Sequence, residues 1–195
     1  MNEGYIKFNC NWIPSNDIPL DKVAALNVWR KIMYEKGLIG VYPDGSGFGN
    51  ISMRCGEKTF LISGTATGGL ATLTELHYSL VTQYDLSTNS VTCVGPLKAS
   101  SESLTHALIY ECSAETNAVI HVHNLDAWNR LIHHVPTSSE KISYGTPDMA
   151  NEIKRLFNET SLSKEKIIVM GGHREGIISF GKDLEEAGNI LMNKL

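Results

Sequence analysis

The sequence has no surplus of basic residues and no long apolar run, and each absence excludes a class of protein. Its 17 Lys and Arg residues stand against 21 Asp and Glu residues, which gives a net charge of −4. A protein that binds nucleic acid normally shows a basic surplus or stripe, so nucleic acid is not an expected partner. No apolar run approaches the roughly 20 residues of a membrane-spanning helix, so no membrane partner is expected either.

Cysteine is scarce, and its distribution points to a reduced protein. The four cysteines, Cys10, Cys55, Cys93 and Cys112, are scattered without a C-x-x-C pair. The first ten residues contain no basic segment followed by an apolar core, as a secretory signal would. A chain of 195 residues can also bury enough surface to fold without disulfides. We therefore expect a cytoplasmic protein with a single domain over residues 1–195.

The common nucleotide-binding motifs are also missing, although two loops are rich in glycine. These loops are VYPDGSGFGN (41–50) and GTATGG (64–69). Neither contains the G-x-x-x-x-G-K-[ST] of a P-loop or the dinucleotide fingerprint, so ATP and NAD are poor candidates. Most glycine-rich loops are only turns, but such turns can also wrap a phosphate with backbone N–H groups.

Helix-like and strand-like stretches alternate along the chain, which is typical of an α/β fold. Apolar residues recur at helical spacing over 21–36. A second helix is expected after Ser100 or Ser101, either of which could be its N-cap. Two more should begin near Thr146 and near Asp183. Strands are expected at 51–54, 59–63, 118–123, 167–170 and 177–180, with a hairpin over 77–94.

Seven histidines are present, and three of them could form a metal site. His121 and His123 lie two apart in a predicted strand, so both side chains should project from the same face. Such a pair is about as often a packing feature as a pair of ligands. His173 follows a different predicted strand and could supply a third nitrogen. Three histidines with an open position are typical of a catalytic zinc site.

Glu102 stands at the expected start of a helix, in KASSESLTHALIY (98–110). A carboxylate there is stabilised by the helix dipole, so capping is the simpler interpretation. The alternative is a general base beside a metal ion, with Ser100, Ser101 and the helix-start amides forming an anion site. His106, one turn later, would share the face of Glu102.

Five short strings, taken in order, resemble the class II aldolase/adducin family. They are GFGNISMR (47–54), KASSESLTHALIY, AVIHVH (118–123), SYGTPDMA (143–150) and GIISFGKDLEEA (176–187). The family includes fuculose-phosphate and rhamnulose-phosphate aldolases, ribulose-phosphate 4-epimerase and methylthioribulose-phosphate dehydratase. The resemblance implies a three-layer α/β/α fold with a largely antiparallel central sheet. It also implies a homo-oligomer, with a tetramer as the first candidate.

The resemblance assigns a role to each candidate residue. These are His121, His123 and His173 as ligands of zinc (Zn2+); Glu102 as catalytic acid and base; and Asn50, Thr65, Ala66, Ser100 and Ser101 for phosphate or substrate binding. The function it implies is a zinc-dependent lyase that acts on a small hydroxy-ketone or sugar phosphate through a metal-stabilised enediolate. The alternatives are a dehydratase or 4-epimerase of the same family, or a non-catalytic adducin-like interaction module, from which the metal ligands should be missing.

Two departures from the family pattern affect the site. Arg174 and Glu175 separate His173 from Gly176, where the family's last ligand usually precedes the glycine directly, so Glu175 is a possible substitute ligand. The stretch between His123 and Tyr144 is short and offers no counterpart to the tyrosine that donates a proton in the sugar-phosphate aldolases. Tyr144, His133 and His134 are weak candidates for that role, and His77 is expected at the surface.

Overall fold

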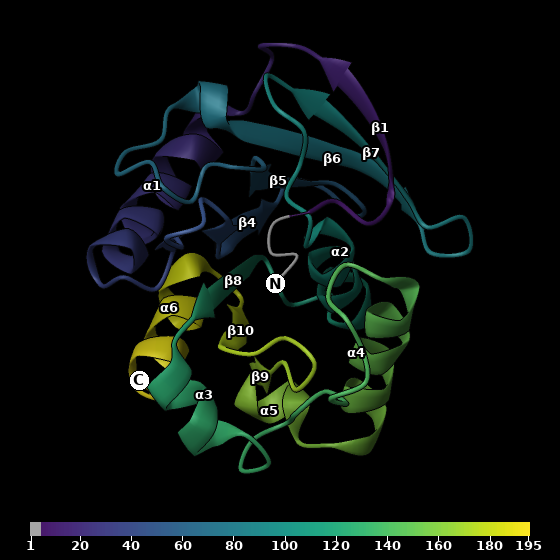
Figure 1. Ribbon diagram of the computed structural model, residues 1–195. Helices are drawn as coiled ribbons and strands as arrows, with labels where there is room; N and C mark the ends of the chain where they lie inside the picture. The colour runs from purple at the N-terminus through teal and green to yellow at the C-terminus, as the bar shows by residue number, and fades with distance from the viewer. Residues whose placement is uncertain (1–4) are drawn as a thin grey trace.

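An eight-stranded sheet forms the centre of the computed structural model, which describes residues 5–195 (Figure 1). Its strand order is β1-β7-β6-β5-β4-β8-β10-β9. All neighbouring pairs are antiparallel except β1 and β7, which are parallel. The strands are β1 (Asn9–Pro14), β4 (Asn50–Arg54), β5 (Phe60–Ser63), β6 (Tyr78–Asp85), β7 (Ser90–Gly95), β8 (Ala118–His123), β9 (Ile167–Val169) and β10 (Gly176–Gly181).

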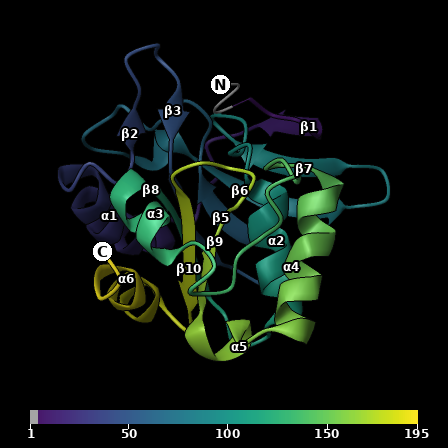
Figure 2. The same cartoon turned by 60° about the horizontal axis from the view of Figure 1, so that its bottom comes forward.

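Helices cover both faces of the sheet, which confirms the expected three-layer α/β/α fold (Figures 1 and 2). One face is covered by α1 (Leu20–Glu35) and α6 (Leu184–Met192), and the other by α2 (Ser103–Cys112) and α4 (Pro147–Glu159). Each face has its own apolar core. The smaller elements are β2 (Gly40–Val41), β3 (Gly47–Phe48), the 3-10 helix η1 (Glu75–His77), α3 (Leu125–Leu131) and α5 (Leu162–Glu165).

Strand β8 shows how the alternation of side chains places the candidate ligands. Val119 packs in the core under α2 and α4, whereas Ile120 and Val122 pack in the core under α1 and α6. Because successive strand residues point to opposite faces, His121 and His123 lie on the same face as Val119. The two histidines therefore face the α2 and α4 side, as the sequence pattern predicts.

Most of the expected elements are found, with three differences. The second helix begins at Ser103, later than expected, because Glu102 occupies its N-cap position. The glycine-rich loop 41–50 forms most of the small β2–β3 hairpin, which begins at Gly40. Strand β1 was not expected, because this segment is short and largely exposed and its pairing partner β7 lies about 80 positions away.

Two expectations concern membranes and targeting. Within residues 5–195, no helix is both long enough and apolar enough to cross a membrane. The absence of a secretory signal was inferred from the first ten residues, of which residues 1–4 lie outside the described part. The location of the protein in the cell therefore stays a prediction.

Arg30 in α1 connects this helix to the loop that follows β5. Its side chain is 2% exposed, and its guanidinium donates only to backbone carbonyls. Nη2 donates to Thr67 O and Gly68 O at 2.9 Å each, and Nη1 donates to Leu70 O. Among the described residues, no carboxylate forms an ion pair with Arg30. A buried cation thus holds the shape of a glycine-rich loop.

Replacing Arg30 with methionine should destabilise the fold. The carbonyls of Thr67 and Gly68 would remain buried without their donor, and each such loss costs about 1–3 kcal/mol. We expect the free energy of unfolding, measured with urea, to fall by about 3 kcal/mol. Lys31→Met is the matched control, because Lys31 is exposed on the same helix, and should change it by less than about 0.5 kcal/mol. Equal stability of the two variants would contradict this role for Arg30.

Candidate functional site

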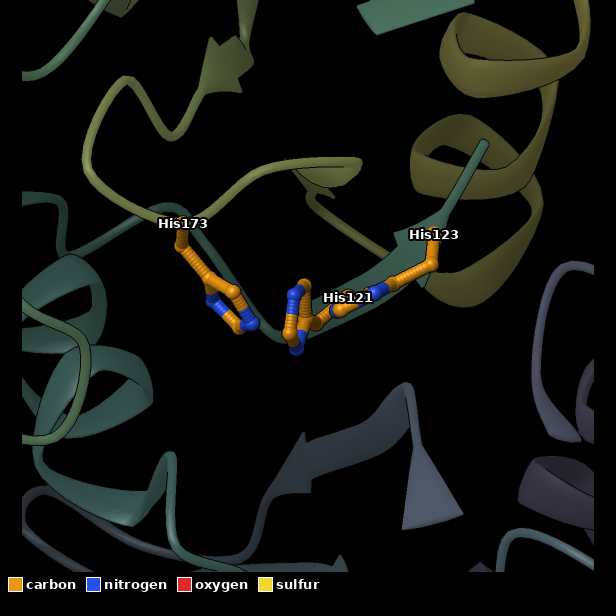
Figure 3. Close-up of side chains that lie close together, drawn as sticks. All are labelled: His121, His123 and His173. Atoms are coloured by element: carbon orange, nitrogen blue, oxygen red, sulfur yellow. The ribbon is translucent and has the colours of Figure 1, made fainter. Parts of the chain in front are cut away.

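Three histidines from two segments meet at the end of β8. His121 and His123 come from the strand and His173 from the β9–β10 loop, and the three rings point toward one another (Figure 3). One possible ligand nitrogen from each ring lies within 4.8 Å of those of the other two. All three residues are buried. The structure therefore brings together the three residues that the sequence analysis selected, in an arrangement that can hold a metal ion.

The backbone around His173 explains how a loop residue reaches the strand pair. Gly176 lies opposite His123 in the β8–β10 ladder. A Cβ atom at Gly176 would lie only 3.2 Å from ring atoms of His173, so glycine leaves the room that this ring needs. On its other side the ring stacks on Tyr144, with 4.5 Å between the ring centroids. Tyr144, a weak candidate for proton donor, therefore lies at the site.

Burial controls the charge of the two strand histidines. Desolvation lowers the pKa of both His121 and His123 well below the usual value for histidine, and their histidine neighbours lower it further. Both imidazoles are therefore neutral at physiological pH. The neutral ring is the form that binds metal ions.

The surroundings of His121 fit a bound cation. Asn50 stands directly opposite His121 in the β4–β8 pair, and its side-chain amide lies 3.2 Å from Nδ1 of His121. Among the described residues, neither Nε2 of His121 nor Oδ1 of Asn50 has a hydrogen-bond partner. If the amide presents Oδ1, Nδ1–H can donate to it and Nε2 keeps its lone pair for a metal ion. In that arrangement Nδ1–H satisfies Oδ1 of Asn50, and a metal ion would satisfy Nε2 of His121.

Glu102 occupies the N-cap position of α2, but its side chain does not form a hydrogen bond that caps the helix. For its carboxylate, only the favourable interaction with the helix dipole therefore remains of the capping interpretation. Oε2 accepts a hydrogen bond of 2.9 Å from Thr105, and Oε1 lies 3.5 Å from Nδ1 of His173. The side chain is 2% exposed. A buried carboxylate therefore stands beside the histidine cluster, where a general acid or base would be needed.

A polar pocket adjoins the cluster through Asn50 and Glu102. It brings together all five residues expected to bind phosphate or substrate, which were selected from three separate segments. Its lining residues are Gly47, Gly49, Asn50, Gly64, Thr65, Ala66, Thr67, Gly68, Ser100, Ser101 and Glu102. The glycines expose backbone to the pocket, which suits an anionic ligand.

Backbone pairing holds two walls of this pocket together. Gly64 forms an isolated antiparallel bridge with Ala99, and the N–H of Thr65 donates to Lys98 O at 2.9 Å. Ala66 adopts a left-handed conformation with a φ of 59°. The loop after β5 is thus fixed beside the serines that precede α2.

Glu175 is not part of the candidate metal-binding cluster, which contains the three histidines alone among the described residues. Instead, its carboxylate accepts a hydrogen bond of 2.7 Å from Tyr42. The Tyr42 hydroxyl also lies 2.8 Å from Nδ1 of His123. The sequence analysis missed Tyr42, because no spacing connects it with residues 81 and 133 positions away.

The remaining histidines with described contacts have structural surroundings. His106 contacts Ser52 at 2.7 Å, and complete burial lowers its pKa to about 3; it belongs to no metal cluster among the described residues. His77 accepts a hydrogen bond from the N–H of Thr74 at 3.0 Å and so caps η1. His133 is exposed, 3.7 Å from Glu140. None of these contacts brings its histidine into the three-histidine cluster.

Comparison with known proteins identifies the family. The model of the Class II Aldolase and Adducin N-terminal domain matches residues 31–192. An L-fuculose phosphate aldolase of Methanocaldococcus jannaschii is 30% identical over 177 residues, which cover 86% of this chain and 88% of that protein.

Solved structures with lower identity support the fold. An L-fuculose 1-phosphate aldolase superposes with a TM-score of 0.67 at 19% identity, over 91% of this chain and 83% of that chain. A sugar-phosphate aldolase from Thermotoga maritima superposes with a TM-score of 0.67 at 16% identity, over 89% and 90% of the two chains. The match to the family model and the 30% identity to the Methanocaldococcus jannaschii protein show that the chain belongs to the class II aldolase and adducin family.

Proposed function

We propose that this protein is a zinc-dependent aldehyde-lyase of the class II aldolase type, which cleaves a small phosphorylated hydroxy-ketone. One observation carries the proposal: the Glu102 carboxylate lies 3.5 Å from His173 of the three-histidine cluster. The relative from Methanocaldococcus jannaschii is named L-fuculose phosphate aldolase, which supports a sugar phosphate as the substrate class.

The donor set favours zinc as the cofactor. Three imidazole nitrogens that leave a coordination position open are typical of catalytic zinc sites, whereas structural sites usually take four protein ligands. His121, His123 and His173 would hold the ion. Bound zinc would act as a Lewis acid on the oxygens of the hydroxy-ketone and stabilise the enediolate charge that develops on the substrate.

Glu102 would move the proton that the reaction needs at carbon. In the cleavage of a β-hydroxy-ketone, a base takes the hydroxyl proton, the carbon–carbon bond breaks and the hydroxyl-bearing carbon leaves as an aldehyde. The carbon beside the carbonyl keeps the electron pair and must then take up a proton. Glu102 can deliver this proton and can remove it in the reverse, condensing direction. Thr105 would keep the carboxylate in place through its hydrogen bond to Oε2.

The pocket beside Glu102 would bind the phosphate. Ser100 and Ser101 offer hydroxyl donors, Asn50 offers its amide, and the loop with Thr65 and Ala66 offers backbone N–H groups. Hydrogen bonds to a charged phosphate are stronger than those to a neutral group. Because this binding acts at a distance from the reacting carbons, it would orient the substrate toward the cluster.

The same residues suit the other reactions of the family, because dehydration and epimerisation can begin from the same activated hydroxy-ketone. The alternative to an enzymatic function is a non-catalytic interaction module. The retained histidines and Glu102 favour catalysis, because a binding surface has no need of them. We expect a homo-oligomer, with a tetramer as the first candidate.

Zinc analysis tests the cofactor. We expect the purified wild-type protein to bind about one Zn2+ per chain, measured by metal analysis after dialysis. The double variant His121→Ala/His123→Ala should retain less than a tenth of this amount, since it loses two of the three ligands. His77→Ala is the control, because His77 lies on η1 outside the cluster. An unchanged zinc content in the double variant would overturn the site.

Glu102→Gln tests the acid–base role. A panel of ketose 1-phosphates should be cleaved by the zinc-loaded wild type, and the variant should lose about 10²- to 10⁴-fold in kcat while keeping its zinc. Glu111→Gln, at an exposed position of the same helix, should retain full activity. A wild type that cleaves, dehydrates and epimerises none of the panel would instead support the interaction module.

Ser101→Ala tests the phosphate pocket. With a phosphorylated substrate, kcat/KM should fall about tenfold or more, because a charge-assisted hydrogen bond is lost. With the unphosphorylated analogue, the same variant should match wild type. The control is Ser87→Ala in the exposed β6–β7 turn, which should alter neither value. Equal losses on both substrates would argue against a phosphate contact at Ser101.

A further inference from the structure

A chain of hydrogen bonds leads from the metal cluster to Glu175. The hydroxyl of Tyr42 lies 2.8 Å from Nδ1 of His123 and 2.7 Å from Oε2 of Glu175. Tyr42 follows β2, His123 ends β8, and Glu175 precedes β10. Three segments that are distant in the sequence therefore meet at one side of the candidate metal centre.

The direction of these hydrogen bonds determines which nitrogen of His123 carries the proton. A phenolic hydroxyl has a single hydrogen, and an ionised carboxylate can only accept. Since Tyr42 donates to Glu175, its oxygen can only accept from His123. Nδ1 of His123 is then the protonated nitrogen, and Nε2 keeps the lone pair that a metal ion requires.

The backbone holds Glu175 where this chain needs it. The N–H of Asn124, the residue after His123, donates to Glu175 O at 3.0 Å. Glu175 has a φ of 74°, a left-handed conformation that costs a glutamate of the order of 1 kcal/mol or more and persists only where its surroundings impose it. The conformation thus turns the side chain of the residue beside Gly176 toward Tyr42 rather than into the histidine cluster.

Aromatic packing fixes the other end of the chain. The Tyr42 ring lies 4.5 Å from that of Phe48 across the β2–β3 hairpin, centroid to centroid. Phe48 in turn lies 5.3 Å from His123. The hairpin is closed by the N–H of Tyr42, which donates to Ser46 O at 2.8 Å. A rigid support of this kind limits the positions that the hydroxyl can take.

We propose that Tyr42 and Glu175 are positioning residues for the metal ligand His123. They fix its tautomer and ring orientation, and the negative charge of Glu175, passed on through the hydroxyl, makes Nε2 a stronger donor to the ion. Such outer partners commonly change metal affinity by about 10- to 100-fold. This inference rests on the metal site of the proposed function but does not depend on the reaction catalysed.

Metal affinity measured without substrate tests the proposal. In competition with a chelator, Tyr42→Phe should raise the dissociation constant of Zn2+ about 10- to 100-fold. Glu175→Gln, which keeps a hydrogen-bond acceptor but removes the charge, should have a smaller effect in the same direction. The visible absorption bands of the Co2+-substituted protein should shift in Tyr42→Phe, because the geometry at His123 changes. A purely structural role would not move these bands.

A double-mutant cycle tests whether the two residues act as one chain. Because Glu175 acts through Tyr42, Tyr42→Phe/Glu175→Ala should bind zinc no more weakly than Tyr42→Phe alone. Tyr34→Phe in α1 and Glu185→Ala on the surface of α6 are the matched controls and should bind zinc as wild type does. The metal-free variants should unfold within about 0.5 kcal/mol of wild type.

Three results would overturn the inference. They are a wild type that binds no zinc, zinc affinities of Tyr42→Phe and Glu175→Ala equal to wild type, or fully additive losses in the double variant. A wild type that binds zinc but turns over no substrate would overturn the proposed lyase activity and leave this inference standing. The two proposals therefore fail in different experiments.

Discussion

The burial of three neighbouring imidazole rings is the constraint on which the rest of the site depends. Polar ring atoms are costly to bury unless they find partners. Nδ1 of each ring lies close to a polar side chain. The neighbour is Asn50 for His121, Tyr42 for His123 and Glu102 for His173. The strand pair is kept neutral by desolvation. The nitrogens that remain are those that one shared metal ion can use.

Loops supply most of the residues around this cluster, and buried polar contacts fix those loops. Arg30 holds the loop after β5 through carbonyl groups alone, so the positions of Thr65 and Ala66 depend on a helix on the opposite face of the sheet. Gly176 gives room to the ring of His173. A rigid sheet with loops tied to it in this way can keep three imidazoles, a carboxylate and a polar pocket in a constant arrangement.

The predictability of the site differs from residue to residue. Alternation in β8 was sufficient to place His121 and His123 on one face, and the order of motifs selected His173 and the pocket residues. Glu102 was ambiguous, because a carboxylate at a helix start serves equally for capping and for catalysis. The structure adds its contacts with Thr105 and His173, and such contacts have no sequence signature. Glu102 is also the N-cap of α2, so the helix begins at Ser103, later than the sequence analysis expected.

The sequence by itself determined the elements whose apolar pattern repeats at a regular spacing, and with them the face of the sheet that carries the ligands. Only the tertiary structure decided the parallel pairing of β1, the anchoring by Arg30 and the contact of Tyr42 with Glu175. The physical reason is that periodicity specifies which side of an element is buried, whereas it does not specify which distant segment arrives there. Tyr42 and Glu175 are 133 positions apart. They meet because the β2–β3 hairpin and the loop that contains Glu175 both lie beside His123, the last residue of β8.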